Sequence, residues 1–314
     1  MRILLTGATG VIGRRVVPLL VAAGHEVKAV ARTPRREAPL ERLGAVPVPI
    51  DLFDRESVQR AARGQDAIVN LATHVPRSTL RMMLPGAWRQ NDRIRRIAAS
   101  NLVDAAIGAG VARFVQESFA LAYPDCGADW IDEDQRLQPA RYNRTLLDAE
   151  ASAERFTRTG GAGVVLRFAA FYGPDAVQSR DMMAFVRKGW APLPGAPDAF
   201  HSTVSHDDAA AAVAVALGIA PGVYNVVDDE PLTRRAYADA LAGALGVAPP
   251  RFLPSWVARL AGSMGELMSR SERVSNARLT RASPWRPGFP SAREGWRAIV
   301  TAASHAMPAV PGGH

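Results

Sequence analysis

The chain has 314 residues, 48% hydrophobic and 22% charged, which excludes disordered and fibrous proteins and indicates a globular one. The net charge of +8 comes almost entirely from arginine, because Lys28 and Lys188 are the only lysines. The arginines are scattered along the chain, so we favour a compositional bias over a nucleic-acid partner. The single cysteine, Cys126, excludes an intramolecular disulfide and a cysteine-built metal site.

A membrane span is not expected. The longest apolar run, residues 209–223, is shorter than a bilayer requires and is broken by Gly218 and Pro221. At the N-terminus a glycine loop interrupts the apolar residues before a signal peptide can develop. We therefore expect a cytoplasmic protein.

The first half of the chain alternates short apolar strands with amphipathic helices. Glycine or aspartate residues at the boundaries mark several of the ends, as in the segment capped by Asp54. The predicted strands are 2–5, 26–32, 66–72, 112–118 and 163–169, and the predicted helices are 12–24, 54–64, 91–110 and 142–159. This alternation predicts an α/β fold with a doubly wound parallel sheet, the Rossmann arrangement.

The alternation lapses after residue 173, where prolines mark a loop-rich region. Residues 203–217 read as a strand and a capped helix, and 222–228 as another strand. We predict a Rossmann domain over 1–173 to which segments 203–228 return. A smaller lobe would comprise 174–202 and 229–314, including helices at 233–246 and 255–270.

The glycine-rich segment 6-TGATGVIG-13 is the strongest local signal. Gly7, Gly10 and Gly13 lie between the first predicted strand and helix. This spacing allows a tight turn, close approach of a pyrophosphate to the backbone, and close packing of helix on sheet. The segment therefore predicts dinucleotide binding, with the phosphates at the helix N-terminus.

Arg32 ends the second predicted strand, where an NAD site would carry an acidic residue. A guanidinium there, with Arg35 and Arg36 nearby, can pair with a ribose 2′-phosphate. We therefore expect NADP(H) in preference to NAD(H). The residues expected to contact the cofactor are Gly7, Thr9, Gly10, Val11, Ile12, Gly13, Arg32, Arg35, Asp51, Leu52, Leu71, Ala72, Thr73, Phe168 and Phe171.

The sequence suggests two further candidate sites, one catalytic and one metal-binding, each with a structural alternative. Glu117 closes the central strand, where a doubly wound fold places its ligand, and could act as an acid or base or be an ion-paired structural residue. His201 and His206 lie near two aspartates, but their spacing fits a capped helix start better than a metal site. We expect no metal.

Taken together, these motifs resemble the extended short-chain dehydrogenases/reductases of the NAD-dependent epimerase/dehydratase type. The resemblance covers about residues 1 to 300 and rests on TGATGVIG, DLFD at 51–54, 165-VLRFAAFYGP-174, 204-VSHDDAA-210, 223-VYNVVDDEPLT-233 and 284-PWRPGFPSAREGW-296. It implies a Rossmann domain with a small C-terminal substrate lobe.

The resemblance also implies an active site, from which this chain departs. Tyr142 matches the family tyrosine, but Leu146 stands where a lysine would lower the phenol pKa and hold the nicotinamide ribose. The family serine or threonine position falls on Phe119, with Ser118 one place early, and the helix asparagine position falls on Arg95. We expect Arg95 to supply the missing cation.

The leading functional hypothesis is an NADP(H)-dependent oxidoreductase acting on a carbonyl or alcohol of a small, fairly apolar molecule. Tyr142 would transfer the proton, assisted by Ser118 or Glu117. One alternative keeps the cofactor pocket for non-redox chemistry such as cyclisation, elimination or isomerisation, and another is a nucleotide-sensing regulator. The expected partner is a small-molecule substrate, without nucleic acid or membrane. The sequence leaves the oligomeric state open between a monomer and a homodimer, and the resemblance implies that helices 91–110 and 142–159 would form the interface of a homodimer.

Overall fold

The computed structural model describes residues 1–306 except 77–78, 83, 85, 192, 255, 257–259 and 261. Its centre is a seven-stranded parallel sheet in the order β12-β7-β5-β4-β1-β2-β3. These strands are β1 (Arg2–Thr6), β2 (Glu26–Val30), β3 (Val46–Val48), β4 (Ala67–Asn70), β5 (Arg113–Phe119), β7 (Ala162–Phe168) and β12 (Gly222–Val226). The predicted doubly wound α/β fold is confirmed.

Helices cover both faces of the sheet. On one face, α1 and α9 pack together and bury Val16, Val17 and Val213 against the strands. On the other, α3, α6 and α7 bury Val58, Leu102 and other apolar residues. The bounds are α1 (Gly13–Ala22), α2 (Glu37–Glu41), α3 (Arg55–Ala62), α4 (Thr79–Met82), α5 (Arg89–Arg93), α6 (Ala99–Gly108), α7 (Leu146–Arg158) and α9 (His206–Val215), with short turns η1 (Pro34–Arg36) and η2 (Ile94–Ala98).

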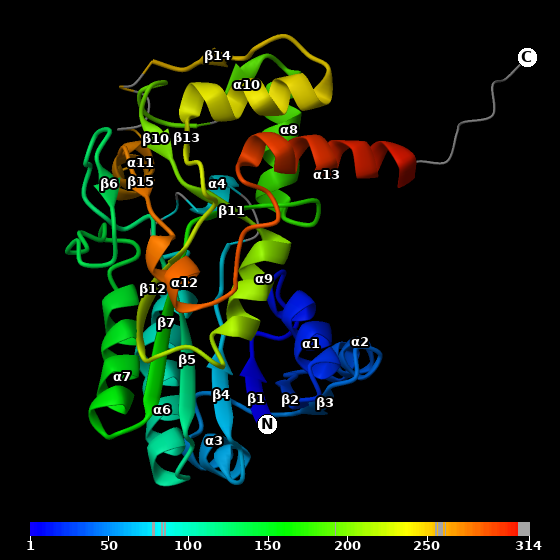
Figure 1. Ribbon diagram of the computed structural model, residues 1–314, viewed down its shortest axis with the longest axis vertical. Helices are drawn as coiled ribbons and strands as arrows, with labels where there is room; N and C mark the ends of the chain where they lie inside the picture. Colours follow the sequence, from blue (N-terminus) through cyan, green and yellow to red (C-terminus); the bar gives the residue numbers. More distant parts are fainter. Residues whose placement is uncertain are drawn as a thin grey trace, which may run out of the picture.

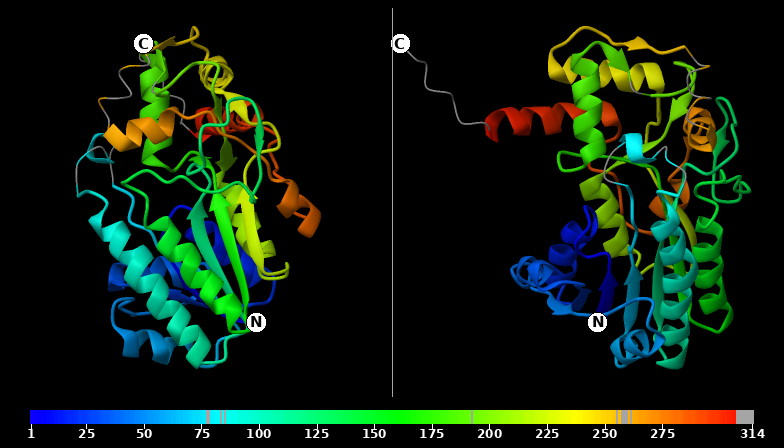
Figure 2. Two further views of the ribbon diagram at one scale, coloured as in Figure 1. Left: turned by 90° about the vertical axis from the view of Figure 1, so that its left-hand side faces the viewer. Right: turned by 180° about the vertical axis from the view of Figure 1, so that it is seen from behind.

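A smaller lobe lies beyond the carboxyl ends of the strands, opposite the N-terminus (Figure 1). Its core joins α8, α10 and α13 around Tyr172, Tyr237 and Trp296. Figure 2 shows α13 projecting sideways from this lobe. The remaining helices are α8 (Val177–Arg187), α10 (Arg234–Leu245), α11 (Gly262–Ser269), α12 (Ala277–Ala282) and α13 (Ala292–Ala306).

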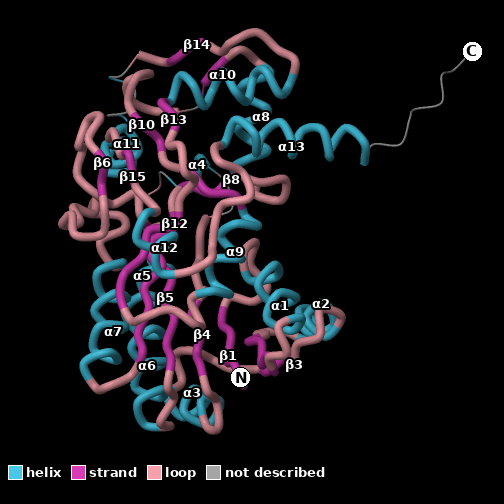
Figure 3. Tube along the Cα trace, in the orientation of Figure 1, coloured by secondary structure: helices cyan, strands magenta, loops and turns pink. Residues whose placement is uncertain are grey.

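Outside the central sheet, four short two-stranded sheets hold the loops together. In Figure 3, loops dominate the chain around β6, between β5 and α7. The paired strands are β6 (Trp130–Ile131) with β15 (Arg273–Val274), β8 (Ala170–Tyr172) with β11 (Thr203–Ser205), β9 (Trp190–Ala191) with β14 (Arg251–Phe252), and β10 (Phe200–His201) with β13 (Leu232–Thr233). The β6–β15 pair therefore ties the loop before α7 to the C-terminal part of the chain.

The element bounds differ from expectation at two places that matter for the site. The predicted helix 142–159 begins at Leu146, because residues 141–145 form turns. The predicted helix 91–110 is divided into α5, the π-helical η2 and α6. Part of the predicted helix 255–270 lies outside the described residues, and α11 (Gly262–Ser269) occupies most of the described part. The exact boundary between domain and lobe stays a prediction.

No helix among the described residues is long and apolar enough to cross a bilayer.

Candidate active site at the carboxyl edge of the sheet

The glycine loop between β1 and α1 is shaped by close backbone approaches. Gly7 has φ +70°, and a Cβ there would lie 2.2 Å from the carbonyl oxygen of Leu71. A Cβ on Gly13 would lie 2.2 Å from the carbonyl oxygen of Gly7. Both positions therefore require glycine, and the loop keeps the bare backbone that a pyrophosphate needs. These residues fit a dinucleotide.

Arg15, on α1, holds this loop in place. Its Nη1 donates to the carbonyl oxygen of Val11 at 3.0 Å. The same guanidinium pairs with Asp175 at 2.5 Å and with Asp207, at the start of α9, at 2.6 Å. The glycine loop is thus fastened to two segments that follow β8 and β11. Sequence reasoning did not single out Arg15.

The arginines expected at the adenosine end are exposed. Arg36 donates to the Thr9 hydroxyl at 3.3 Å, whereas Arg32 and Arg35 make no ion pair or hydrogen bond with any described residue. Both can therefore pair with a phosphate without breaking an existing contact. Asp51, also exposed, accepts a hydrogen bond from the backbone N–H of Phe53 at 3.0 Å.

A row of buried polar side chains crosses three neighbouring strands near their carboxyl ends. The Thr6 hydroxyl donates to Asn70 Oδ1 at 2.6 Å, and Asn70 Nδ2 donates to Gln116 Oε1 at 2.9 Å. Strand register sets Thr6 beside Asn70 and Asn70 beside Gln116. This row fixes the strand ends just before Leu71 and Ala72, which are buried, and Thr73, which is exposed. Thr6 and Asn70 end their apolar strands and Gln116 lies inside β5, so a polar residue in each of three apolar strands was the signal available in the sequence.

Tyr142 lies in the turns before α7, partly buried against Trp88, with ring centroids 5.0 Å apart. Trp88 is held by a hydrogen bond from its indole N–H to the carbonyl oxygen of Met82 at 2.9 Å. Burial raises the pKa of the Tyr142 phenol, because it disfavours the charged phenolate, although the nearby Arg95 charge opposes this. The phenol is therefore protonated at neutral pH.

Leu146 is fully buried as the first residue of α7. Tyr142 and Leu146 do not share a continuous helix, so the side-by-side arrangement expected from four-residue spacing is not set by helical geometry. Leu147, which follows Leu146 in the chain, is 40% exposed.

Arg95 and Glu117, singled out separately from the sequence, form an ion pair. Arg95 Nη2 lies 3.1 Å from Glu117 Oε1, and both side chains are largely buried. Arg95 comes from η2 and Glu117 from β5. The Nε of Arg95 is buried without a partner among the described residues. The pair places a fixed cation near Tyr142 and assigns Glu117 an ion-paired role.

The Ser118 hydroxyl makes its hydrogen bond to Glu150 on α7 and not to Tyr142. Its hydroxyl donates to Glu150 Oε1 at 2.5 Å, and the same carboxylate pairs with Arg167 at 2.8 Å. Arg167 also donates to the Tyr123 hydroxyl at 2.8 Å, which in turn donates to Asn225. Ser118 thus belongs to a buried network joining β5, α7, β7 and β12, a connection that sequence reasoning missed.

The two expected cofactor contacts at the end of β7 are aromatic neighbours. Phe168 is buried and Phe171 is 40% exposed, with ring centroids 5.5 Å apart. Phe171 also lies 6.1 Å from the ring of His206. The exposed face of Phe171 leaves an apolar surface at the carboxyl edge of the sheet.

His206 should make stability depend on pH. Burial and the nearby Arg15 charge lower its pKa to about 4, below its usual 6.5. The unfolded state therefore binds more protons than the folded state between pH 4 and 6.5. The contribution of neutral His206 to the free energy of unfolding, about 3 kcal/mol, is complete above pH 6.5 and is lost as the pH falls toward 4. We expect His206→Gln to flatten the fall in unfolding free energy over this window in denaturant titrations. His74→Gln, at an exposed position, is the control, and equal curves for both variants would contradict the assignment.

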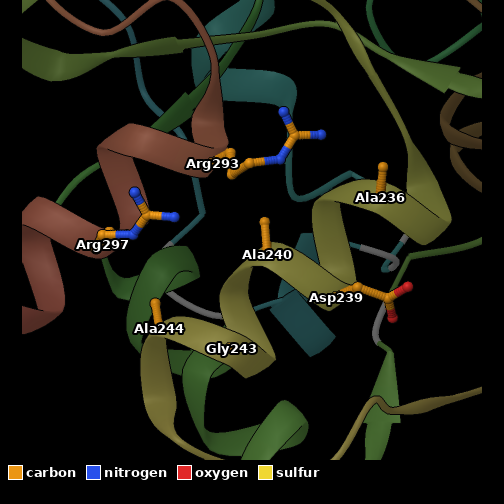
Figure 4. A pocket seen from close by; sticks show the side chains of 7 residues that line it. All are labelled: Ala236, Asp239, Ala240, Gly243, Ala244, Arg293 and Arg297. Atoms are coloured by element: carbon orange, nitrogen blue, oxygen red, sulfur yellow. The ribbon is translucent and has the colours of Figure 1, made fainter.

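Within the described part of the chain, no group of three or more histidine, cysteine, aspartate or glutamate side chains could hold a metal ion. A groove in the lobe lies between α10 and α13, where Arg293 and Arg297 extend over small residues of α10 (Figure 4). It is lined by Ala236, Asp239, Ala240, Gly243, Ala244, Arg293 and Arg297. None of these residues belongs to the glycine loop or the Tyr142 neighbourhood.

A glycine loop at the first strand–helix junction and a tyrosine before α7 define a Rossmann-type dinucleotide-binding protein. A family model described as NAD(P)H-binding matches residues 7–217. The chain belongs to this NAD(P)H-binding family.

Relatives of known name include several oxidoreductases. The chain is 36% identical over 306 residues to a 3-diazoavenalumate denitrifying reductase from a Streptomyces species, covering 94% of this chain and 99% of the relative. It is 28% identical to a 2-alkyl-3-oxoalkanoate reductase from Stenotrophomonas maltophilia, covering 78% and 76%. The chain is thus an oxidoreductase-like member of the family.

Solved structures share the fold. The human epimerase family protein SDR39U1 with NADPH superposes with a TM-score of 0.78 at 22% identity, covering 96% of this chain and 99% of that one. The UDP-glucose 4-epimerase of Thermus thermophilus with NAD gives 0.76 at 25% identity, covering 98% and 100%. Both cofactors thus occur among the structural neighbours.

Proposed function

We propose that the protein is an NADP(H)-dependent reductase of small, fairly apolar electrophiles, with Tyr142 as proton donor. The observation that carries the proposal is the partly buried phenol beside Trp88, close to the fixed cation of Arg95. Its raised pKa keeps it protonated, so it can donate a proton but is a poor base at neutral pH. A phenol that is protonated at neutral pH matches the proton-donor role that reduction requires.

The cofactor would lie along the carboxyl edge of the sheet. Its pyrophosphate would meet the glycine loop, and Phe171 would provide apolar surface at the nicotinamide end. When bound, the nicotinamide supplies a hydride to the substrate. In carbonyl reduction the Tyr142 hydroxyl donates its proton to the oxygen, and Arg95 stabilises the phenolate that remains. Arg95 would thereby take over the electrostatic part of the missing lysine's role.

The preference for NADP(H) rests on Arg32. We expect Arg32→Asp to lower NADPH affinity by at least about tenfold and to reverse the preference toward NADH, because a carboxylate repels the 2′-phosphate and accepts hydrogen bonds from a free ribose. Calorimetric titration with both cofactors measures this. Arg42→Asp makes the same change of charge at an exposed residue directly after α2 and controls for net charge. Equal wild-type affinities for the two cofactors would contradict the assignment.

A second candidate is reductive removal of nitrogen from a diazo compound, favoured by the 36% identical relative named for such a reaction. For an arenediazonium ion, hydride forms a new C–H bond while the C–N bond breaks and N₂ leaves with the bonding pair. No proton donor is needed, so a weakly acidic phenol and a buried leucine at position 146 present no obstacle.

NADPH oxidation at 340 nm tests the proposal. The protein is assayed with a panel of aromatic aldehydes and ketones and, separately, with arenediazonium salts in low-temperature stopped flow. Products are identified as alcohol or as arene plus N₂. Turnover with either class supports a reductase and distinguishes the two candidates. Tight cofactor binding without NADPH oxidation in both panels would instead favour non-redox chemistry or a regulatory role.

A further inference from the structure

Arg234, the first residue of α10, is a buried guanidinium with unused donors. The residue is 2% exposed. Its Nη2 donates to the carbonyl oxygens of Met268 at 2.6 Å and Arg270 at 2.7 Å. Its Nε and Nη1 are buried and have no hydrogen-bond partner among the described residues. A buried cation with unpaired donors is costly unless an anion or another acceptor is supplied.

Arg234 forms no ion pair with any acid in the described part of the chain. Burial lowers its pKa to about 10, and the nearby charges of Glu272 and Asp125 oppose this only in part. Glu272 is 3% exposed, and burial raises the pKa of its carboxyl group well above the usual value. One of its carboxyl oxygens is also without a partner. Arg234 is therefore a buried cation with unused donors and no direct anionic partner among the described residues.

This cluster adjoins the reaction site. Charges on Glu272 and Arg270 both act on the Tyr142 phenol, Glu272 raising its pKa and Arg270 lowering it. Arg270 Nη1 donates to the carbonyl oxygens of Tyr123 at 2.9 Å and Gln138 at 2.6 Å, in the segment that leads to Tyr142. Arg234 and Tyr142 thus share Glu272 and Arg270 as neighbours, with Arg234 on the lobe side.

We propose that Arg234 binds a carboxylate of the substrate, so that the protein acts on an organic acid. The inference rests on the proposed function and narrows its substrate class. The carboxylate supplies the missing charge and accepts hydrogen bonds from the unused N–H groups of Arg234. The apolar part of the acid extends toward Trp88 and Tyr142, where the electrophilic group reacts.

Binding is tested without turnover. Benzoate, cinnamate and their primary amides are titrated calorimetrically into the NADP⁺-loaded protein. We expect at least one acid to bind at least about tenfold more tightly than its amide in the wild type. Arg234→Met should remove about 100-fold of the acid's affinity, because the carboxylate then enters the lobe without its cation, and should leave amide binding unchanged.

The neighbouring Arg235 provides a matched control. Its side chain is 45% exposed, stacks over Phe252 at 4.4 Å, and lies 3.9 Å from Asp239. Arg235→Met should leave acid binding at the wild-type level. If Arg234→Met does not fold, Arg234→Lys keeps the charge, and the wild-type comparison of acid with amide remains decisive.

Two results would overturn the inference: equal wild-type binding of every acid and its amide, or full acid affinity in Arg234→Met. Neither of these binding results would contradict the proposed function, because that function is tested by NADPH oxidation with any electrophile. Conversely, tight binding of acids without NADPH oxidation would remove the proposed function while leaving Arg234 as an anion-binding residue.

Discussion

Tyr142→Phe is expected to lower the rate of NADPH-dependent carbonyl reduction by about 10²- to 10⁴-fold, the usual contribution of a positioned proton donor. Removing one hydroxyl keeps the ring against Trp88, so folding and NADPH affinity should be unchanged. Single-turnover kinetics with a saturating aldehyde separates the chemical step from cofactor binding. The same variant should retain turnover of an arenediazonium ion, whose reduction requires no proton.

Arg95→Leu serves as the companion to this experiment. It leaves the Glu117 carboxylate buried without its cation, so we expect most carbonyl turnover to be lost and the protein to be less stable. Arg95→Lys keeps the positive charge and should recover part of the rate. Full carbonyl reductase activity in Tyr142→Phe would show that the phenol is not the donor, and Glu117 would be the next group to test.

Leu146→Lys is expected to destabilise the protein by several kcal/mol rather than to restore a family active site. Leu146 is fully buried at the start of α7, so an ammonium group there loses its hydration. Its folded-state pKa would fall below the unfolded value, and the unfolded state would bind more protons at neutral pH. The destabilisation should therefore shrink as pH rises toward 10. Chemical denaturation at several pH values measures both effects.

Leu147→Lys supplies the control, because Leu147 adjoins Leu146 but is 40% exposed. It should change the unfolding free energy by less than about 1 kcal/mol. A fully stable Leu146→Lys protein with increased NADPH-dependent reduction would contradict our interpretation, since it would mean that the site accepts the lysine and that Leu146 marks a weakened redox centre.

Local patterns were sufficient to predict the cofactor loop and the sheet. Gly7 and Gly13 have short-range causes, a turn and a close helix packing, and these follow from spacing along the chain. Apolar strands alternating with helices likewise predicted the parallel sheet. The start of α7 was misplaced because residues 141–145 close i to i+3 turns, such as Leu146 N–H to the carbonyl oxygen of Asn143, which residue periodicity does not distinguish from a helix.

Contacts between distant segments could not be read from spacing. Arg95 and Glu117 were each singled out, but their pairing depends on how η2 lies beside β5. The hydrogen-bond partner of Ser118 is Glu150, on the following helix, and the sequence around Ser118 does not indicate this contact. Arg234 was missed because a surface arginine and a buried one look alike in a sequence, and only the lobe's packing distinguishes them.

The position of β12 has a consequence for how the protein can be divided. This strand pairs with β7 at one border of the sheet, yet residues 169–221 separate the two along the chain. A fragment ending before residue 222 would leave β7, with its apolar sequence AGVVLRF, as an unprotected edge strand able to recruit other chains. During synthesis the nascent polypeptide faces the same hazard until Gly222–Val226 emerges. Expression of a shortened nucleotide-binding portion should therefore yield aggregates unless it includes β12.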